Sequence, residues 1–235
     1  MPQILIEPIA YIKNKYKEKF GIPRQSNLVD STISTIVFEE KYRDENSLRG
    51  LSEYSHIWLI WQFDKAKSKK DWFPTVRPPR LGGNERVGVF ATRSPYHPNG
   101  LGISCVQLIN IEKDSKFGFV LKIKGADLLD NTPIIDIKPY LSFTDSFPDA
   151  KCGFADNVID YKLQVEFDEK FKSVISYDEY KELLGILSQD PRPSYHNDKN
   201  RVYKMSYSDY EISFKVDKMN LTVIDITKGC EQWKN

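Results

Sequence analysis

The stretch FGFVLKI at residues 117–123 places an apolar side chain at every second position, at Phe117, Phe119, Leu121 and Ile123. Since neighbouring side chains of a β-strand point to opposite faces of a sheet, this alternation predicts a strand with one buried face. Further candidate strands cover residues 4–12, 33–38, 56–63, 86–92 and 103–111. No helical repeat separates them, which favours an antiparallel sheet, and six or seven such strands tend to close into a barrel without exposed edges.

The pattern changes after Pro148. Ser176 and Glu179 have the spacing of a capping box, which begins a helix, and Pro191 ends the helical pattern. Apolar side chains follow the box at helical spacing, at Tyr180, Leu183, Leu184 and Leu187, and candidate strands cover residues 202–207, 210–216 and 221–226. We therefore predict a mainly β fold, with an antiparallel β-barrel domain in residues 1–150 and a small α+β C-terminal domain in residues 151–235.

The charge is unevenly distributed although the net charge of the 235 residues is only +1. Between Lys67 and Arg93 the chain carries seven basic residues against Asp71 and Glu85. Such a local excess favours a polyanionic partner, and the alternative is a basic surface that only contacts solvent.

Several classes of protein are disfavoured by what the chain lacks. The order of residues in a signal peptide is absent, and the longest apolar run, at residues 56–63, is too short to cross a bilayer, so we expect a cytoplasmic protein without membrane contacts. Three cysteines without a C-x-x-C pair and three scattered histidines disfavour a disulfide framework and a metal site. Neither a Rossmann glycine motif, nor a P-loop, nor a G-x-S-x-G motif occurs.

The polar residues gather instead in five segments: IPRQ (22–25), RPPRLGG (77–83), ATRSPYHPNGLG (91–102), GADLLDNTP (125–133) and DIKPY (136–140). The third segment is stiff, because Pro95 and Pro98 fix their own φ while Gly100 and Gly102 allow close backbone approach. Such a loop is either a tight corner of a sheet or a preorganised binding loop.

In this order and spacing, the segments closely resemble the TrmO (TsaA-like) family of tRNA adenine methyltransferases. The resemblance covers nearly the whole chain, and it also includes YKEKFGIPRQ (16–25), LRGLSEYSHIWL (48–59), DSFPDA (145–150) and QDPRPSYH (189–196). It implies a β-barrel that binds S-adenosylmethionine, a homodimer with the cofactor near the subunit interface, and methylation of the exocyclic amine of threonylcarbamoyl-adenosine beside the anticodon of tRNA. A non-catalytic module that binds S-adenosylmethionine or RNA stays the alternative.

The resemblance also implies which residues contact the cofactor. These expected contacts are Pro23, Arg24, Gln25, Arg93, Leu101, Asp127, Leu128, Leu129 and Asp130. Asp64 and Lys65 stand where relatives carry His-Gln, so only backbone contacts are expected there. S-adenosylmethionine presents a carboxylate, an ammonium, a sulfonium and an adenine, which require a cation, oxygen acceptors and an apolar slot.

The basic stretch and the stiff loop supply the expected RNA contacts: Lys69, Lys70, Arg77, Arg80, Arg86 and His97. His97 stands where relatives usually carry Arg. A protonated His97 is suited to an anion, and the alternative is a neutral ring that stacks or forms hydrogen bonds within the loop.

Asp136 and Lys138 in DIKPY are candidate catalytic residues, because amino-methyltransferases of DNA use a short Asp/Asn-Pro-Pro-aromatic motif to hold the acceptor amine. The alternative is that both side chains hold the barrel strand and the loops above it. Since the sulfonium is already a good leaving group, we expect positioning to contribute more than acid or base catalysis.

Overall fold

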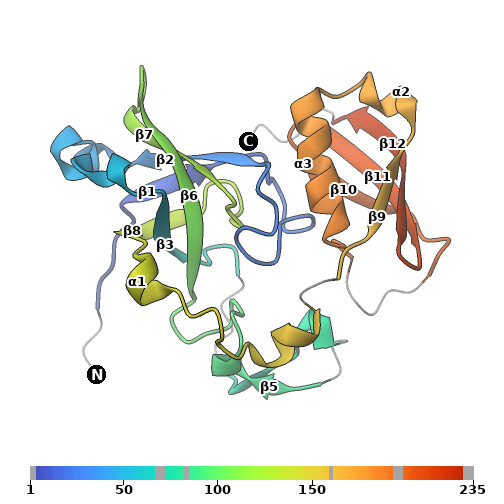
Figure 1. Ribbon diagram of the computed structural model, residues 1–235, viewed down its shortest axis with the longest axis horizontal. Coiled ribbons are helices and arrows are strands. Elements are labelled where there is room, and N and C mark those ends of the chain that lie inside the picture. The colour runs from blue at the N-terminus through green and yellow to red at the C-terminus, as the bar shows by residue number, and fades with distance from the viewer. Residues whose placement is uncertain (1–3, 67–71, 82–84, 159–160, 193–197, 230–235) are drawn as a thin grey trace.

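A computed structural model describes residues 4–66, 72–81, 85–158, 161–192 and 198–229. Six strands form one sheet that closes on itself in the order β1-β2-β7-β6-β3-β8, with β8 pairing back onto β1 (Figure 1). They are β1 (Ala10–Lys13), β2 (Ile33–Phe38), β3 (His56–Gln62), β6 (Leu101–Asp114), β7 (Gly118–Lys124) and β8 (Pro133–Pro139). Every pair in this ring is antiparallel, which confirms the mainly β, antiparallel prediction.

The inside of the ring is filled by the alternating apolar side chains of its strands. In β3, Ile57, Leu59 and Trp61 are buried, and the residues between them face outward. Leu121 and Ile123 of the predicted FGFVLKI strand are fully buried in the same core. The alternation in the sequence therefore identified the inward face of these strands correctly.

Two predicted strands differ from the structure. Residues 4–9 form no strand, because Ile4 and Leu5 are exposed and Pro8 has no N–H to donate. Only the end of this segment contacts the ring, where the Ile9 N–H donates to Ile134 O of β8. The predicted strand 86–92 is reduced to β5 (Val87–Gly88), since the chain turns into a short helix at Val89–Ala91, where the backbone N–H of Thr92 donates to Val89 O. β5 pairs with β4 (Thr75–Val76) in a separate two-stranded ribbon at the lower edge of Figure 1.

The C-terminal residues form a four-stranded sheet in the order β10-β11-β12-β9, covered on one face by helix α3 (Figure 1). Its strands are β9 (Gln164–Phe167), β10 (Tyr203–Tyr207), β11 (Tyr210–Asp217) and β12 (Asn220–Lys228). The three strands predicted here are confirmed, whereas β9, which pairs parallel to β12, is an addition. The remaining helices are α1 (Ser142–Asp145), α2 (Glu169–Lys172) and six short 3₁₀ segments: Glu40–Tyr42, Glu45–Leu48, Leu51–Glu53, Pro79–Leu81, Val89–Ala91 and Gly153–Val158.

Helix α3 (Tyr177–Ser188) begins at the predicted capping box. The Ser176 hydroxyl accepts from the backbone N–H of Glu179, and the Glu179 carboxylate accepts from the backbone N–H of Ser176. The helix ends at Ser188, shortly before Pro191, as predicted. None of the described helices is long and apolar enough to cross a membrane.

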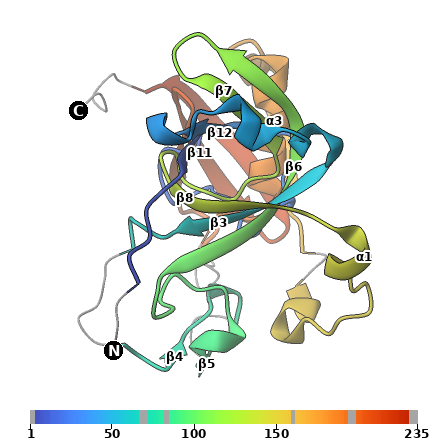
Figure 2. The ribbon, with the colours of Figure 1, turned by 90° about the vertical axis from the view of Figure 1, so that its left-hand side faces the viewer.

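A second core lies between α3 and the C-terminal sheet, which stands behind the ring in Figure 2. This core also takes Tyr16 and Val29 from the N-terminal half, with Phe20 and Ile22 packed against it. Phe20 stacks on Phe214 of β11 at 6.2 Å between ring centroids. The N-terminal loop therefore packs against the C-terminal sheet, and the domain boundary near residue 150 stays a prediction.

Candidate functional site

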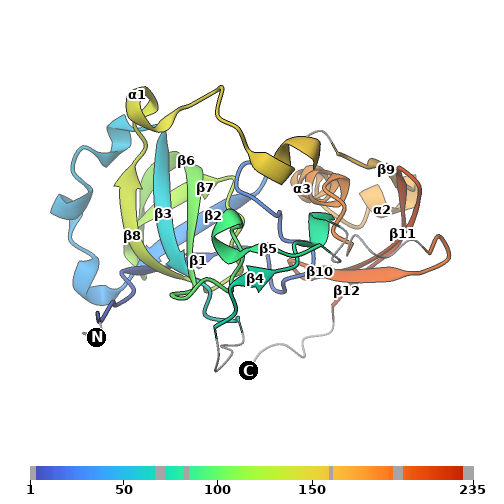
Figure 3. The same ribbon diagram turned by 90° about the horizontal axis from the view of Figure 1, so that it is seen from below.

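A large groove of about 1660 Å³ runs along the lower edge of the ring. Its walls come from the loop with Arg24 and Gln25, the end of β3, the β4–β5 ribbon, the stiff loop at residues 91–100 and the segment around Phe154. Figure 3, seen from below, places the β4–β5 ribbon between the ring and the C-terminal sheet. Segments far apart in the sequence are thus brought to one cavity.

Arg93 and Gln25 both line this groove and contact each other. The Arg93 guanidinium Nη1 donates to Gln25 Oε1 at 2.7 Å, although 68 residues separate them in the sequence. The contact joins the IPRQ segment to the stiff loop. It leaves other N–H groups of the planar guanidinium to face an anion such as a carboxylate.

Asp127 adds a carboxylate to this cluster. Trp61 Nε1 donates to Ser104 Oγ at 3.0 Å, and the Ser104 hydroxyl donates to Asp127 Oδ1 at 2.6 Å. Burial raises the pKa of Asp127, and the hydrogen bond from Ser104 and the charge of Arg93 oppose that rise. The structure thus brings together a guanidinium, an amide and a carboxylate from Arg93, Gln25 and Asp127. Their contact with a cofactor stays a prediction.

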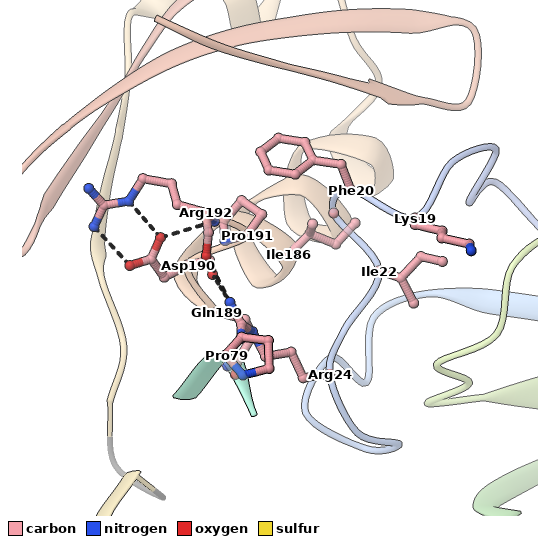
Figure 4. A pocket seen from close by; sticks show the side chains of 11 residues that line it. Lys19, Phe20, Ile22, Arg24, Pro79, Ile186, Gln189, Asp190, Pro191 and Arg192 are labelled. Carbon is pink, nitrogen blue, oxygen red and sulfur yellow. Dashed lines mark hydrogen bonds and ion pairs between the residues drawn. The ribbon is translucent and has the colours of Figure 1, made fainter. Parts of the chain in front are cut away.

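Arg24 turns toward the C-terminal half instead. Its Nη2 donates to the backbone carbonyl of Arg192 at 2.8 Å and of Asp190 at 3.3 Å. Asp190 and Arg192 form an ion pair of 2.8 Å beside a smaller cavity of about 330 Å³, shown in Figure 4. The Arg24 side chain therefore ties the IPRQ loop to the segment that follows α3.

The other expected cofactor residues lie in two places, in the segment between β7 and β8 and around the neighbouring ends of β3 and β6. Leu128 is buried in the ring core, Leu129 O accepts from the Thr132 hydroxyl, and Asp130 pairs with Lys17 at 2.9 Å. Leu101 is partly exposed at the start of β6, while Asp64 and Lys65 pair with each other at 3.4 Å after β3, and Lys19 Nζ donates to Lys65 O. The contacts of these six residues with a cofactor stay predictions, together with those of the buried Pro23.

Asp136 and Lys138 lie on β8 and form an exposed ion pair of 2.8 Å with each other. Neither side chain lines the groove. Their catalytic role stays a prediction, and the contact agrees with the alternative in which they hold the strand. Within the described ranges, His, Cys, Asp and Glu side chains form no group of three that could hold a metal ion.

The expected RNA contacts are only partly within the described residues. Arg77 and Arg86 line the groove, and Arg86 Nη1 donates to Thr75 Oγ1 at 2.9 Å. Lys69, Lys70 and the side chain of Arg80 lie outside the described part. The His97 Nε2 donates to the backbone carbonyl of Thr92 at 2.8 Å, and its ring meets the edge of Phe90, as the in-loop alternative requires. Contact of any of these side chains with RNA stays a prediction.

Sequence reasoning missed the aromatic side chains of the groove. Trp72, Phe73, Phe90 and Tyr96 line it and are exposed. The available signal was four aromatic residues within and beside the basic stretch, where a solvated surface would carry few. Only the charges of that stretch had been weighed.

The raised pKa of Asp127 gives a pH-dependent prediction. The pKa of Asp127 is higher in the folded protein than in the unfolded chain. Protonated Asp127 therefore contributes its full stability below the pKa of the unfolded chain, and this contribution is lost as the pH rises through the pKa of the folded protein. Asp127→Asn cannot ionise. We therefore expect the free energy of unfolding of Asp127→Asn, measured by urea denaturation, to rise relative to that of the parent as the pH increases from about 4 to 7. Asp149→Asn, at an exposed site, should parallel the parent, and a pH-independent difference for Asp127→Asn would contradict the prediction.

Comparison with known proteins finds two family models along the chain. The tRNA-methyltransferase O N-terminal domain matches residues 11–146, and the TrmO C-terminal domain matches residues 160–229. The chain is 38% identical to a tRNA (adenine(37)-N6)-methyltransferase of Escherichia coli, over 92% of this chain and 94% of that protein. It is 35% identical to a putative S-adenosylmethionine-dependent methyltransferase of Pseudomonas aeruginosa, over 95% and 98% of the two chains.

Among solved structures, a crystal structure of TrmO from Pseudomonas aeruginosa superposes with a TM-score of 0.76 at 29% identity. The match covers 96% of this chain and all of that chain. The arrangement of ring and C-terminal sheet is therefore similar to that of a known protein over nearly its whole length.

Proposed function

Since the chain belongs to the tRNA-methyltransferase O family and is an S-adenosylmethionine-dependent tRNA adenine methyltransferase, we propose that its acceptor is the exocyclic amine of threonylcarbamoyl-adenosine next to the anticodon. The acceptor rests on the family to which the chain belongs, and the cluster of Gln25, Arg93 and Asp127 supports the binding of the methyl donor. This cluster places a cation, an amide and a carboxylate beside a groove large enough for a nucleoside cofactor and part of a tRNA.

The donor set of this cluster fits the charged end of S-adenosylmethionine. Arg93 would hold the carboxylate with charge-assisted hydrogen bonds, and Asp127 would accept from the ammonium group. An ammonium beside Asp127 also favours its ionised form, which offsets the burial that raises its pKa. When bound, S-adenosylmethionine supplies a methyl group on a positively charged sulfur.

The protein's own contribution to the transfer is positioning. The Trp61–Ser104–Asp127 hydrogen bonds fix the carboxylate, and Gln25 fixes the orientation of Arg93. Groups held in this way lose little freedom when the ligand binds, which is how an enzyme aligns an acceptor with a methyl group. Since neither Asp136 nor Lys138 lines the groove, we propose a direct role for this exposed pair only after a change that brings it to the acceptor.

We further propose that two copies associate with the cofactor near their interface, and that the enzyme acts in the cytoplasm. Both proposals rest on the family to which the chain belongs. Sedimentation at several protein concentrations tests the first, and localisation of a tagged protein tests the second.

Methyl transfer tests the proposed function. With labelled S-adenosylmethionine, we expect label to enter tRNA that carries threonylcarbamoyl-adenosine and to stay low with tRNA from cells that lack this modification. Mass spectrometry of the digested nucleosides should place the methyl group on the exocyclic nitrogen. Equal labelling of both tRNA samples would contradict the proposed acceptor, and binding without any transfer would favour a non-catalytic module.

A further inference from the structure

The charged residues that line the groove are all cationic. Among the described lining residues none is Asp or Glu, and the cations come from four separate segments: Arg24, Arg77, Arg86, Arg93 and Lys151. A chain with 34 basic and 33 acidic residues has no general reason to line one cavity with a single sign of charge. The groove therefore attracts a polyanion.

The same groove exposes large aromatic rings. The exposed fraction is 53% for Trp72 and 73% for Phe90, and their ring centroids lie 6.4 Å apart at an interplanar angle of 33°. Phe73 and Tyr96 also line the groove and are about half exposed. Four exposed aromatic rings that line one groove indicate a surface for flat ligands.

The β4–β5 ribbon determines where the cations and the aromatic rings of the groove lie. Val76 pairs with Val87, so Arg77 and Arg86, which lie directly beyond this pair, leave the ribbon at the same end. At its opposite end the backbone N–H of Val89 donates to Pro74 O, and this contact brings Phe90 to Trp72. The ribbon thus carries two cations at one end and two aromatic rings at the other.

We propose that this groove binds unpaired nucleotides of RNA, whose bases stack on Trp72 and Phe90 while Arg77 and Arg86 contact the phosphates. The inference deepens the proposed function and rests on it for the identity of the natural RNA. Single-stranded nucleic acid is held by basic grooves with aromatic stacking surfaces, whereas the bases of a duplex already stack on each other and offer no free faces. The volume of about 1660 Å³ exceeds the ~300–1,000 Å³ of a usual small-ligand pocket, which leaves space beside a cofactor.

The test measures anisotropy of labelled oligoadenylate with the full chain. We expect tighter binding of the single strand than of an RNA duplex of equal length. Phe90→Ala should weaken single-strand binding about tenfold, Trp72→Ala by a similar factor, and Phe90→Trp should retain it, because stacking requires only a flat ring. Arg86→Gln should reduce the slope of affinity against salt by about one.

Phe143→Ala is the matched control, because Phe143 is 86% exposed on α1 and does not line the groove. It should bind oligoadenylate like the parent. Equal affinity for single strand and duplex, or unchanged binding by both Phe90→Ala and Trp72→Ala, would overturn the inference. A shift in self-association with no change in RNA affinity would also overturn it and would assign the rings to an interface between copies.

The two proposals fail separately. If the parent binds oligoadenylate through Phe90 but transfers no methyl group to tRNA, the result supports the stacking surface and contradicts the proposed acceptor. If methyl transfer to modified tRNA is measured while Phe90→Ala and Trp72→Ala bind RNA normally, only the stacking surface falls.

Discussion

Arg93→Ala should weaken the binding of S-adenosylmethionine by more than about tenfold. The guanidinium is the cation that Gln25 orients in the groove. It is exposed in the free protein, and a charge-assisted hydrogen bond that the bound ligand covers costs roughly 1.5–3 kcal/mol when it is lost. Isothermal titration calorimetry measures the dissociation constant directly. Arg93→Lys should recover only part of the affinity, because an ammonium cannot reproduce the two-pronged contact of the guanidinium.

Arg86→Ala is the matched control for this experiment. Arg86 lines the same groove and carries the same charge, but it leaves the β4–β5 ribbon and donates to Thr75. It should bind S-adenosylmethionine like the parent. An unchanged dissociation constant for Arg93→Ala would show that Arg93 does not contact the cofactor. An equal loss of affinity in both variants would show that Arg93 acts only through the overall positive charge of the groove.

Phe214→Ala should lower the free energy of unfolding by about 3–5 kcal/mol, the usual cost of removing a large aromatic side chain from a core. Phe214 is fully buried in the second core, between Tyr203 at 5.5 Å and Phe20 at 6.2 Å between ring centroids. Urea denaturation followed by far-UV circular dichroism gives this difference. A loss below about 1 kcal/mol would contradict the packing described for this core.

The same substitution should also weaken S-adenosylmethionine binding. Phe20 lies three residues before Pro23 in the loop that carries Gln25, and it stacks on Phe214. Without Phe214 the loop loses its packing against the C-terminal sheet, although Arg24 still donates to the carbonyls after α3. Phe143→Ala, which removes an equally large but exposed ring, should leave both unfolding and cofactor binding within experimental error of the parent.

Local patterns in the sequence predicted the elements that depend on local physics. Alternation of apolar side chains located the strand at residues 117–123, and the Ser176–Glu179 pair located the start of α3. Side-chain periodicity and a capping hydrogen bond are both features of residues close together in the sequence. The same reasoning extended residues 86–92 into one strand. Its failure came from Val89–Ala91, where apolar residues turn into a short helix because no neighbouring strand extends beyond Thr75–Val76.

Resemblance to a family supplied the candidate residues but not their neighbours. It predicted cofactor contacts for both Arg24 and Arg93. In the structure, Arg93 donates to Gln25, whereas Arg24 donates to the backbone carbonyls of Asp190 and Arg192. It also gave no weight to Trp72 and Phe90, since an aromatic residue in a sequence is equally compatible with a core and with an exposed ring.

The sequence by itself determined most of the strands, the capped helix, the basic stretch and the family, since each depends on residues that are near one another or follow in a fixed order. Only the tertiary structure decided that β8 closes onto β1, that Phe20 stacks on Phe214, and that cations and aromatic rings face the same groove. The physical reason is distance along the chain. Contacts between residues more than 60 positions apart, such as Gln25 with Arg93, exist only after burial of the two cores has fixed the backbone that carries them.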